Sequence, residues 1–346
     1  MDHSADQVCV YHLSSTAVLP KISVTLKNQL VNASLLNATC GDQYVRLSGV
    51  TQLGPPTGLK YDGMARLQTR TGTAVCDPSS GSLIIPAGSH IRELTLLIGA
   101  DTNYDQTKGN EENNFSFRGE DPSVYVESVT SEASAKTESN LRAAHNADYQ
   151  SLMGQFSLDL PDTAGSANLE LSEILDRFAQ KDTSDPYLES LLFTLDRHLF
   201  ISSERENSLP TNLAGRWSET LTAAWSADYH SNINFQMNHW GVDQTGLGDL
   251  QAASWNYIQD TWVPRGTETA RLLYGAPGWV VHDEMDIFGH TGMKDTAQWA
   301  NYPASAAWMM QHVYDHFSYS QNVTWFTAQG YPLLKGIAEF WFSATT

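Results

Sequence analysis

The stretch Asp228-Tyr229-His230-Ser231-Asn232-Ile233-Asn234-Phe235-Gln236-Met237-Asn238-His239-Trp240 alternates amides and imidazoles with apolar residues. Such alternation is typical of a half-buried strand, but Lys, Glu and Thr, the usual solvent-facing residues, are missing from it. Neutral amides and imidazoles fix hydrogen-bond geometry without a full charge, and the neighbouring aromatic rings offer flat apolar faces. The pattern favours a sugar site, because hydroxyls need directional partners and the C–H face of a sugar needs a surface to stack on. The alternative is an Asn-rich turn or helix entry that is buried in a polar network.

Composition narrows the classes of partner. The chain has 346 residues, 41% of them hydrophobic, and 24 glycines, which describes a globular protein of one large or two smaller domains. A formal net charge of −19 argues against a nucleic acid or an anionic membrane surface as partner and suits a neutral substrate. No apolar run approaches the ~18 residues of a membrane span. The oligomeric state is not predicted.

Cysteines and glycosylation sequons favour a secreted glycoprotein. The three cysteines, Cys9, Cys40 and Cys76, are too few and too scattered for a zinc knuckle, and their pairing is left open. Four N-glycosylation sequons begin at Asn32, Asn37, Asn114 and Asn322. Residues 1–4 lack the basic start and apolar core of a signal peptide, so we expect the N-terminus as given to be incomplete.

The first hundred residues predict strands. Polar and apolar residues alternate in 22–26, 44–50 and 64–69, and residues 82–86 and 93–99 are denser in apolar side chains. Turn-forming residues separate these segments at 54–56, 71–72 and 77–81. Short strands at this spacing indicate a β-sandwich. Residues 101–140 are rich in Asn, Asp, Glu and Ser and are predicted to be a loop and linker region.

Helices are predicted for the rest of the chain. Amphipathic patterns cover 141–156, 168–179 and 187–201, and Asp185-Pro186 opens the last of these as N-cap and first-turn proline. In that helix Leu188, Leu191, Leu192, Leu195 and Leu199 are expected to form one apolar stripe. Beyond it, helical segments at 252–262, 267–274, 304–317 and 331–342 alternate with Gly- and Pro-bearing loops, and all ten tryptophans lie between Trp217 and Trp341. These features indicate an all-α domain of helical hairpins.

Several kinds of site are excluded because the chain lacks their sequence motifs. The chain has no GxGxxG, GxxxxGK[ST] or GxSxG segment. His282 and Asp286, four residues apart, could ligate a metal together with His290. We instead expect a sugar-facing loop after Gly278-Trp279 or, failing that, a polar helix entry. No metal and no cofactor is predicted.

Four segments resemble glycoside hydrolase family 95, the inverting 1,2-α-L-fucosidase family. They are Asn212-Leu213-Ala214-Gly215-Arg216-Trp217, Asn232-Ile233-Asn234-Phe235-Gln236-Met237-Asn238-His239-Trp240, Gly278-Trp279-Val280-Val281-His282 and Tyr331-Pro332-Leu333-Leu334-Lys335-Gly336-Ile337-Ala338-Glu339-Phe340. The resemblance implies a multidomain β + α fold. Its expected parts are an incomplete N-terminal β-sandwich at 1–125, a helical linker at 126–200, and the first helices of an incomplete (α/α)6 barrel at 201–346.

The resemblance also implies catalytic roles. Asn232 and Asn234 match the asparagine pair that holds the attacking water and raises the basicity of an aspartate base, which suits an amide because it orients water without taking a proton. His230, Trp279 and His282 are predicted substrate-binding residues. The general acid glutamate and the catalytic aspartate of the family follow the 331–340 segment, so this chain is expected to lack both and to be an inactive fragment. Should it be active, the first carboxylates to test are Asp228, Asp283, Glu284 and Asp286.

The implied activity is a secreted α-L-fucosidase that acts on terminal fucose of oligosaccharides or cell-wall polysaccharides. The alternatives are an α-L-galactosidase of the same family and a carbohydrate-binding protein without catalysis. Some residues depart from the family pattern and leave the fine specificity open. Ala214 replaces a Gln, Ala223-Ala224 replace a proline-containing segment, His239-Trp240-Gly241 replaces Tyr-Trp-Pro, and Asp283-Glu284-Met285 replaces more neutral residues.

Overall fold

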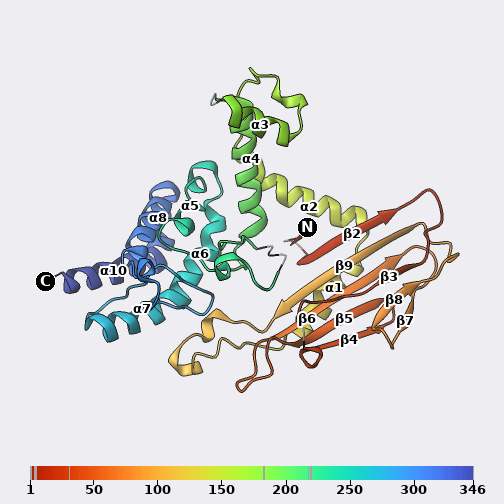
Figure 1. Cartoon of the computed structure of the whole chain (residues 1–346), viewed down its shortest axis with the longest axis horizontal. Helices are drawn as coiled ribbons and strands as arrows, with labels where there is room; N and C mark the ends of the chain where they lie inside the picture. The colour runs from red at the N-terminus through yellow and green to blue at the C-terminus, as the bar shows by residue number, and fades with distance from the viewer. Residues whose placement is uncertain are drawn as a thin grey trace. The chain divides into compact units, whose positions relative to one another are not determined.

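The computed structural model describes residues 2–3, 6–30, 32–181, 184–216, 218 and 220–345. Trp217, which ends the Asn212 motif, and the terminal residues Met1 and Thr346 lie outside this range. The chain folds as two compact units, Met1–Asp148 and Tyr149–Thr346, with strands in the first and helices in the second (Figure 1).

The first unit is built on two antiparallel sheets. The larger has the strand order β1 (Asp2–His3), β2 (Val8–Ser14), β9 (Glu93–Thr102), β6 (Lys60–Thr69), β5 (Tyr44–Val50) and β4 (Leu36–Gly41). The smaller has the order β3 (Ile22–Val24), β8 (Ser82–Ile85) and β7 (Val75–Asp77). Buried side chains of both sheets, among them Val45, Ala65, Leu83 and Ile85, form one core. This arrangement confirms the predicted β-sandwich.

A disulfide fastens the two sheets to each other. Cys40 on β4 pairs with Cys76 on β7, and their Cα atoms are 5.5 Å apart. The pairing that the sequence left open is therefore settled for these two cysteines, while Cys9 lies on β2, outside this bond.

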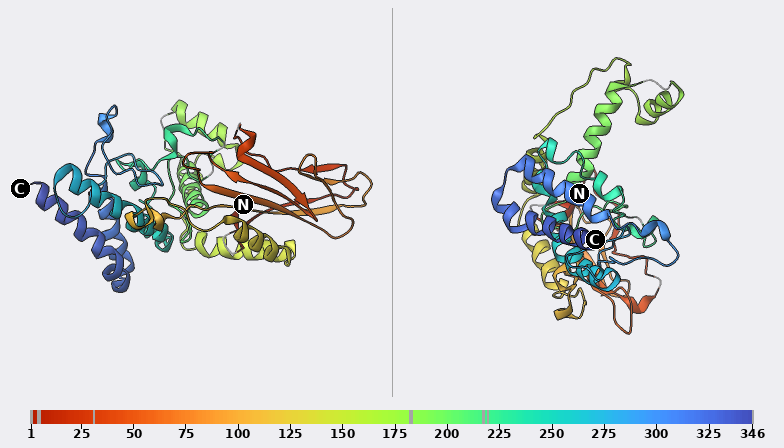
Figure 2. Two further views of the ribbon diagram at one scale, coloured as in Figure 1. Left: turned by 90° about the horizontal axis from the view of Figure 1, so that it is seen from below. Right: turned by 90° about the vertical axis from the view of Figure 1, so that its left-hand side faces the viewer.

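Helix α1 (Pro122–Ser134) covers the other face of the large sheet (Figure 2). Asp121 caps it by accepting a hydrogen bond from the Ser123 amide, and Pro122 fills its first turn. Val126, Thr130 and Ala133 are fully buried. The sheet residues Met64 and Leu97 face this helix, whereas their neighbours Ala65 and Leu96 face the sandwich core, as strand alternation requires.

The predicted loop and linker at 101–140 is correct for residues 103–121 and wrong where α1 forms, since this helix packs on the β unit. The expected boundary at residue 125 falls inside this helix, and the structure divides the chain at Asp148 and Tyr149 instead.

Three helices follow: α2 (Glu138–Met153), α3 (Leu171–Lys181) and α4 (Pro186–Ser203). Asp185 and Pro186 open α4 as predicted, and Asp185 accepts from the Leu188 amide. The expected leucine stripe is wrong, because Leu192, Leu195 and Leu199 are exposed. The buried face instead carries Arg197, whose guanidinium donates to the carbonyls of Thr245 at 2.7 Å and of Leu152 and Met153 at 3.2 Å. These bonds hold the end of α2 against α4.

The helices that follow lie in long runs broken by loops. They are α5 (Asn234–Met237), α6 (Ala252–Tyr257), α7 (Val263–Thr269), α8 (Ser305–Ser320), α9 (Val323–Trp325) and α10 (Tyr331–Ala344). A wider π-helical turn at Ile258–Trp262 joins α6 to α7 without a break, and a second at Ala270–Tyr274 extends α7. A third, at Phe326–Gly330, joins α9 to α10. Residues 252–274 thus form one helical run where the sequence predicted two helices. Short 3₁₀ turns occur at Ala33–Leu35, Gln106–Lys108, Glu111–Asn113, Ser166–Asn168, Ala224–Ala227, Asp243–Thr245, Gly248–Gln251 and Gln298–Ala300.

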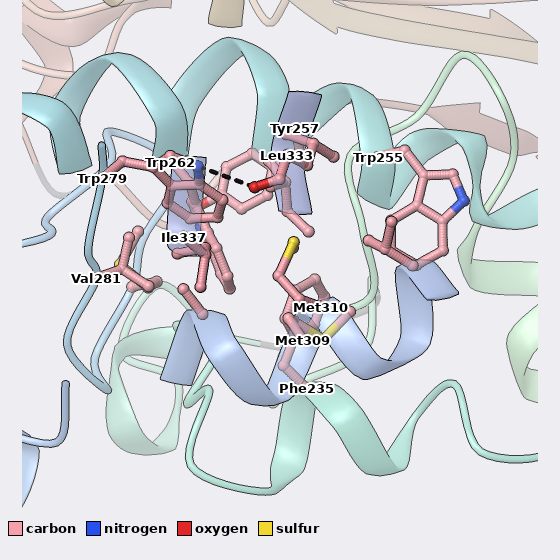
Figure 3. Close-up of a cluster of buried hydrophobic side chains, with 14 of the residues drawn as sticks. Phe235, Trp255, Tyr257, Trp262, Trp279, Val281, Met309, Met310, Leu333 and Ile337 are labelled. Atoms are coloured by element: carbon pink, nitrogen blue, oxygen red, sulfur yellow. Dashed lines mark hydrogen bonds between the residues drawn. The ribbon is translucent and has the colours of Figure 1, made fainter. Parts of the chain in front are cut away.

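The helical unit packs around a core rich in aromatic rings (Figure 3). Trp255, Tyr257 and Trp262 enter it from the 252–274 run, Met309 and Met310 from α8, and Leu333 and Ile337 from α10. Phe235 of α5 is fully buried there, which ties the quoted stretch to this core. In the part of the chain that the structure describes, no helix has the length and apolar character of a membrane span.

Candidate functional site

The segment that carries the predicted site lies against the one that follows the Gly278-Trp279 motif. The Tyr229 amide donates to the Met285 carbonyl at 2.8 Å, and the Ser231 amide and hydroxyl both donate to the Asp283 carbonyl at 2.9 and 3.0 Å. Ser231 is fully buried, so these bonds are shielded from water. They bring His230 and Asn232 next to Asp283, which is about fifty positions further along the chain.

His230 is held in a strained conformation. Its φ of +41° lies in the left-handed region, which is rare for a residue with a side chain. Asp228 offsets this strain with two contacts: one carboxylate oxygen accepts from the His230 amide at 3.1 Å and also pairs with its Nδ1. Burial raises the pKa of Asp228, although the imidazole of His230 acts in the opposite direction. The imidazole is therefore fixed in place by a carboxylate.

Asn232 and Asn234 lie at the start of α5, so this stretch enters a helix, as the alternative interpretation of the sequence had it. Both are half buried, while Ile233 between them is 40% exposed. The Oδ1 atom of Asn232 is inaccessible to solvent and has no hydrogen-bond partner among the described residues. A buried amide oxygen without a partner is costly, so its donor is one that the described residues do not supply.

Asp283 is the most deeply buried acid of this site. Its side chain is fully buried, and neither carboxylate oxygen makes a hydrogen bond of normal geometry within the described residues. Burial raises its pKa, and the imidazole of His230 and the backbone amide of Asn232 oppose that rise. Asp228, His230, Asn232 and Asp283 together form what we call the acid–amide cluster. A carboxyl with a raised pKa, placed beside an imidazole and an amide, is a candidate for acid–base chemistry.

Trp279, a predicted sugar contact, points into the hydrophobic core. It is 2% exposed, and its indole N–H donates to the Leu333 carbonyl at 3.3 Å, the dashed line in Figure 3. The ring also lies against Gly336, where a Cβ would come within 2.4 Å of it. The structure thus gives Trp279 a packing role in this unit, and its contact with a sugar stays a prediction.

His282 is likewise enclosed. It is 1% exposed, its Nδ1 lies 2.7 Å from the Thr291 carbonyl, and its Nε2 lies 2.9 Å from the Tyr274 hydroxyl. A carbonyl only accepts, so Nδ1 carries the proton and Nε2 accepts from Tyr274. Burial lowers the pKa of His282, which keeps the ring neutral. Trp279 thus faces the hydrophobic core and His282 is enclosed by Tyr274 and Thr291, whereas His230 and Asn232 lie beside Asp283.

The metal site considered for His282, Asp286 and His290 does not form. Both ring nitrogens of His282 are engaged, and the exposed His290 lies 3.6 Å from Asp286 instead. No group of three or more potential ligands occurs within the described ranges.

Asp283 is the site residue that the sequence placed least well. The signal was its departure from the neutral residues of the family pattern, and its contact with Asn232 could not be read from the chain.

Comparisons with known proteins bear on the family and the fold of the chain. Residues 137–346 match the glycosyl hydrolase family 95 catalytic domain, and residues 3–107 match the glycosyl hydrolase family 65 N-terminal domain. Among solved structures, a putative kojibiose phosphorylase from human microbiome superposes on 99% of this chain and 42% of its own, with a TM-score of 0.61 and 10% identity. This likeness bears on the fold alone, and it confirms the expected class of a β-sandwich followed by helices of an (α/α)6 barrel.

Relatives with closer sequences are named as fucosidases. "Probable alpha-fucosidase A" of Aspergillus niger is 48% identical over 98% of this chain and 42% of its own length. The protein of the same name from Aspergillus oryzae is 53% identical over 83% of this chain and 39% of its own. "Alpha-L-fucosidase 2" of Arabidopsis thaliana is 29% identical over 90% of this chain and 37% of its own. The chain thus spans about two fifths of the length of these curated relatives. Because the catalytic-domain match covers more than half of its residues, the chain belongs to glycoside hydrolase family 95.

Proposed function

We propose that this chain is part of an inverting α-L-fucosidase that removes terminal fucose from oligosaccharides or cell-wall polysaccharides. The observation that carries the proposal is the Asn232 amide, whose buried Oδ1 has no partner among the described residues and which lies in the acid–amide cluster. Asn232 and Asn234 would hold the attacking water, with His230 lining the pocket. An inverting enzyme needs such a water between an acid and a base that are about 6.5–9.5 Å apart. Following the family resemblance, we place that acid and base elsewhere in the protein.

The names of the relatives support the substrate class, since two fungal proteins and one plant protein that match the chain are all called fucosidases. We further propose that the protein is a secreted glycoprotein. The asparagines of all four sequons are exposed, and the Cys40–Cys76 disulfide is of a kind that persists in oxidising compartments.

The test is hydrolysis of 2′-fucosyllactose by the complete gene product and by its Asn232→Gly and Asn234→Gly variants. Water positioning acts mainly in the transition state, so kcat should fall by about 10²-fold or more while KM changes only a few-fold. Asn140→Gly, the same substitution at an exposed position of α2, is the control. Rates of the site variants within a few-fold of this control would remove both asparagines from the mechanism.

Two further outcomes would redirect the proposal. Faster cleavage of an aryl α-L-galactoside than of the matching fucoside would change the substrate. Turnover by residues 1–346 alone would place the acid and base within this chain, and Asp228, Asp283, Glu284 and Asp286 would then be tested in turn.

A further inference from the structure

The end of α4 carries a buried carboxylate that the proposed reaction does not use. Glu204, the residue after α4, is fully buried. Its Oε2 accepts from the Thr211 amide at 3.1 Å, and its Oε1 accepts from the Ser254 hydroxyl at 2.8 Å. It therefore joins α4 to the loop of the Asn212 motif and to α6. A buried carboxylate is costly unless an opposite charge lies beside it.

That charge comes from His239, which follows α5. Its ring is enclosed, with Nδ1 2.8 Å from the Phe235 carbonyl. Its Nε2 lies 2.9 Å from the Ser254 hydroxyl and 3.4 Å from Glu204 Oε1. Because a carbonyl can only accept, Nδ1 carries a proton, and the charge of the ring depends on whether Nε2 carries one too.

The Ser254 hydroxyl has one proton and lies close to both Glu204 Oε1 and His239 Nε2. With a bare Nε2, two acceptors would compete for that proton, and a lone pair would face the carboxylate. With a protonated Nε2, the imidazolium donates to Ser254 Oγ and Ser254 donates to Glu204, so that each contact is a hydrogen bond. An imidazolium–carboxylate pair therefore satisfies all of these contacts.

We propose that the Glu204–His239 ion pair, relayed through Ser254, is a positioning device for the site asparagines. His239 holds the carbonyl of Phe235, the residue after Asn234, while Glu204 holds the amide of Thr211. The Thr211 carbonyl in turn accepts from the Asn238 side chain at 3.4 Å. The start and end of the helical turn that begins at Asn234 are thus both fixed to one buried carboxylate. The inference rests on the proposed function, in that it names what keeps Asn232 and Asn234 in place.

The groups around the pair determine its response to pH. Burial by itself lowers the pKa of His239, but the charge of Glu204 outweighs it, with Asp243 acting in the same sense, so that the pKa is raised. From α8, His316 pairs with Asp243 at 2.8 Å, and the ring of His312 lies 6.4 Å from that of His239. The pKa of His312 is lowered by burial and by the charge of His239, so the positive charge resides on His239.

The sign of the pH dependence follows. A histidine whose pKa is raised on folding stabilises the folded state fully below its unfolded pKa of about 6.5. That contribution is lost as pH rises through the folded-state pKa. Loss of the Nε2 proton leaves the bond from Nδ1 to the Phe235 carbonyl but breaks the link from His239 through Ser254 to Glu204, so turnover should decline over the same range of alkaline pH.

The test uses Glu204→Gln, His239→Gln and the double variant in the complete gene product, with Glu206→Gln as control because Glu206 is exposed and only two positions away. For Glu204→Gln we expect kcat to fall by about 10²-fold with KM within a few-fold, since misplacing a catalytic group acts on the transition state. The alkaline limb of its pH–rate profile should move to lower pH because His239 has lost its counter-charge. A kcat and profile equal to those of Glu206→Gln would overturn the positioning role.

A second readout does not depend on activity. Unfolding followed by tryptophan fluorescence reports the helical unit, because all ten tryptophans lie between Trp217 and Trp341. Above about pH 6.5 the midpoint of the parent should fall with rising pH more steeply than that of the double variant, whose two carboxamides cannot titrate. Parallel curves would overturn the ion pair even if the fucosidase assay succeeds. The expected slope in a protein without fucosidase activity would support the pair and refute only the proposed function.

Discussion

Replacing Gly278 by alanine tests the contact between the Gly278-Trp279 motif and α10. The φ of Gly278 is +73°, and a Cβ there would lie 2.1 Å from the Gly336 carbonyl oxygen and 2.7 Å from the Phe340 nitrogen. The left-handed conformation alone costs a residue with a side chain roughly 1–2 kcal/mol. Overlap with a packed neighbour adds about 1–3 kcal/mol, and because both atoms belong to the backbone, no side-chain rotation relieves it. We therefore expect a loss of about 2–5 kcal/mol in the free energy of unfolding.

Gly275→Ala is the matched control. Its φ is +62°, yet a Cβ there would meet nothing within 4 Å, so only the conformational cost of about 1–2 kcal/mol applies. For a unit of this size, 1 kcal/mol lowers the midpoint by about 2–4 °C. Gly278→Ala should thus melt about 2–12 °C below Gly275→Ala.

The assay is thermal unfolding of the helical unit by tryptophan fluorescence. Equal midpoints for the two variants would mean that residue 278 does not touch α10 and would refute the close packing of this glycine against the Gly336 carbonyl. A larger loss for Gly275→Ala would do so as well.

Two other perturbations test the two units separately. Cys76→Ser opens a disulfide whose cysteines are 36 positions apart, which should lower the free energy of unfolding of the β unit by about 2–4 kcal/mol. Far-ultraviolet circular dichroism should register this loss while the tryptophan fluorescence transition stays unchanged. Equal losses in both signals would contradict the prediction. His282, whose pKa is lowered by burial, should make the helical unit less stable as pH falls below about 6.5, because the unfolded ring takes up a proton that the folded ring refuses. The difference between the fluorescence midpoints of the parent and of His282→Asn should therefore shrink on acidification, and a constant difference would show that His282 does not contribute.

Sequence periodicity and capping residues predicted most helices and strands. They failed where the buried face of a helix depends on contacts with distant segments of the chain. Alternation gave Tyr44–Val50 with its observed bounds, and the Asp185-Pro186 cap gave the start of α4. Helix α1 was missed because its composition is polar and the face it buries is narrow. The leucine stripe of α4 was misjudged because Arg197 finds three carbonyl partners, and no periodicity in the chain could reveal them.

The candidate site, too, could be predicted only in part from the sequence. The resemblance singled out the asparagine pair, and in the structure Asn234 begins α5 while Asn232 lies two residues before it. It could not say that Trp279 points into the core or that His282 is enclosed by Tyr274, because side-chain direction depends on how this loop lies against α10 and the Ala270–Tyr274 turn. His239 was visible as a departure from a family tyrosine. Its partner Glu204 is 35 positions away, and only the folded chain brings the two together.

Because of its π-helical turns, which residues of the 252–274 helical run face the core depends on the number of residues in the run as well as on their identity. Ile258, Trp262, Gly266 and Ala270 are all buried, at an even spacing of four. In a regular α-helix, residues four apart drift by about 40° around the axis, so this series would leave the core within about three steps. The wider turn at Ile258–Trp262, which rotates by less per residue than a regular α-helix, offsets part of that drift before Gly266 and Ala270 are reached. Deleting a single residue there would rotate everything downstream by about 100° and turn Gly266 and Ala270 out of the core, even though no buried side chain had changed.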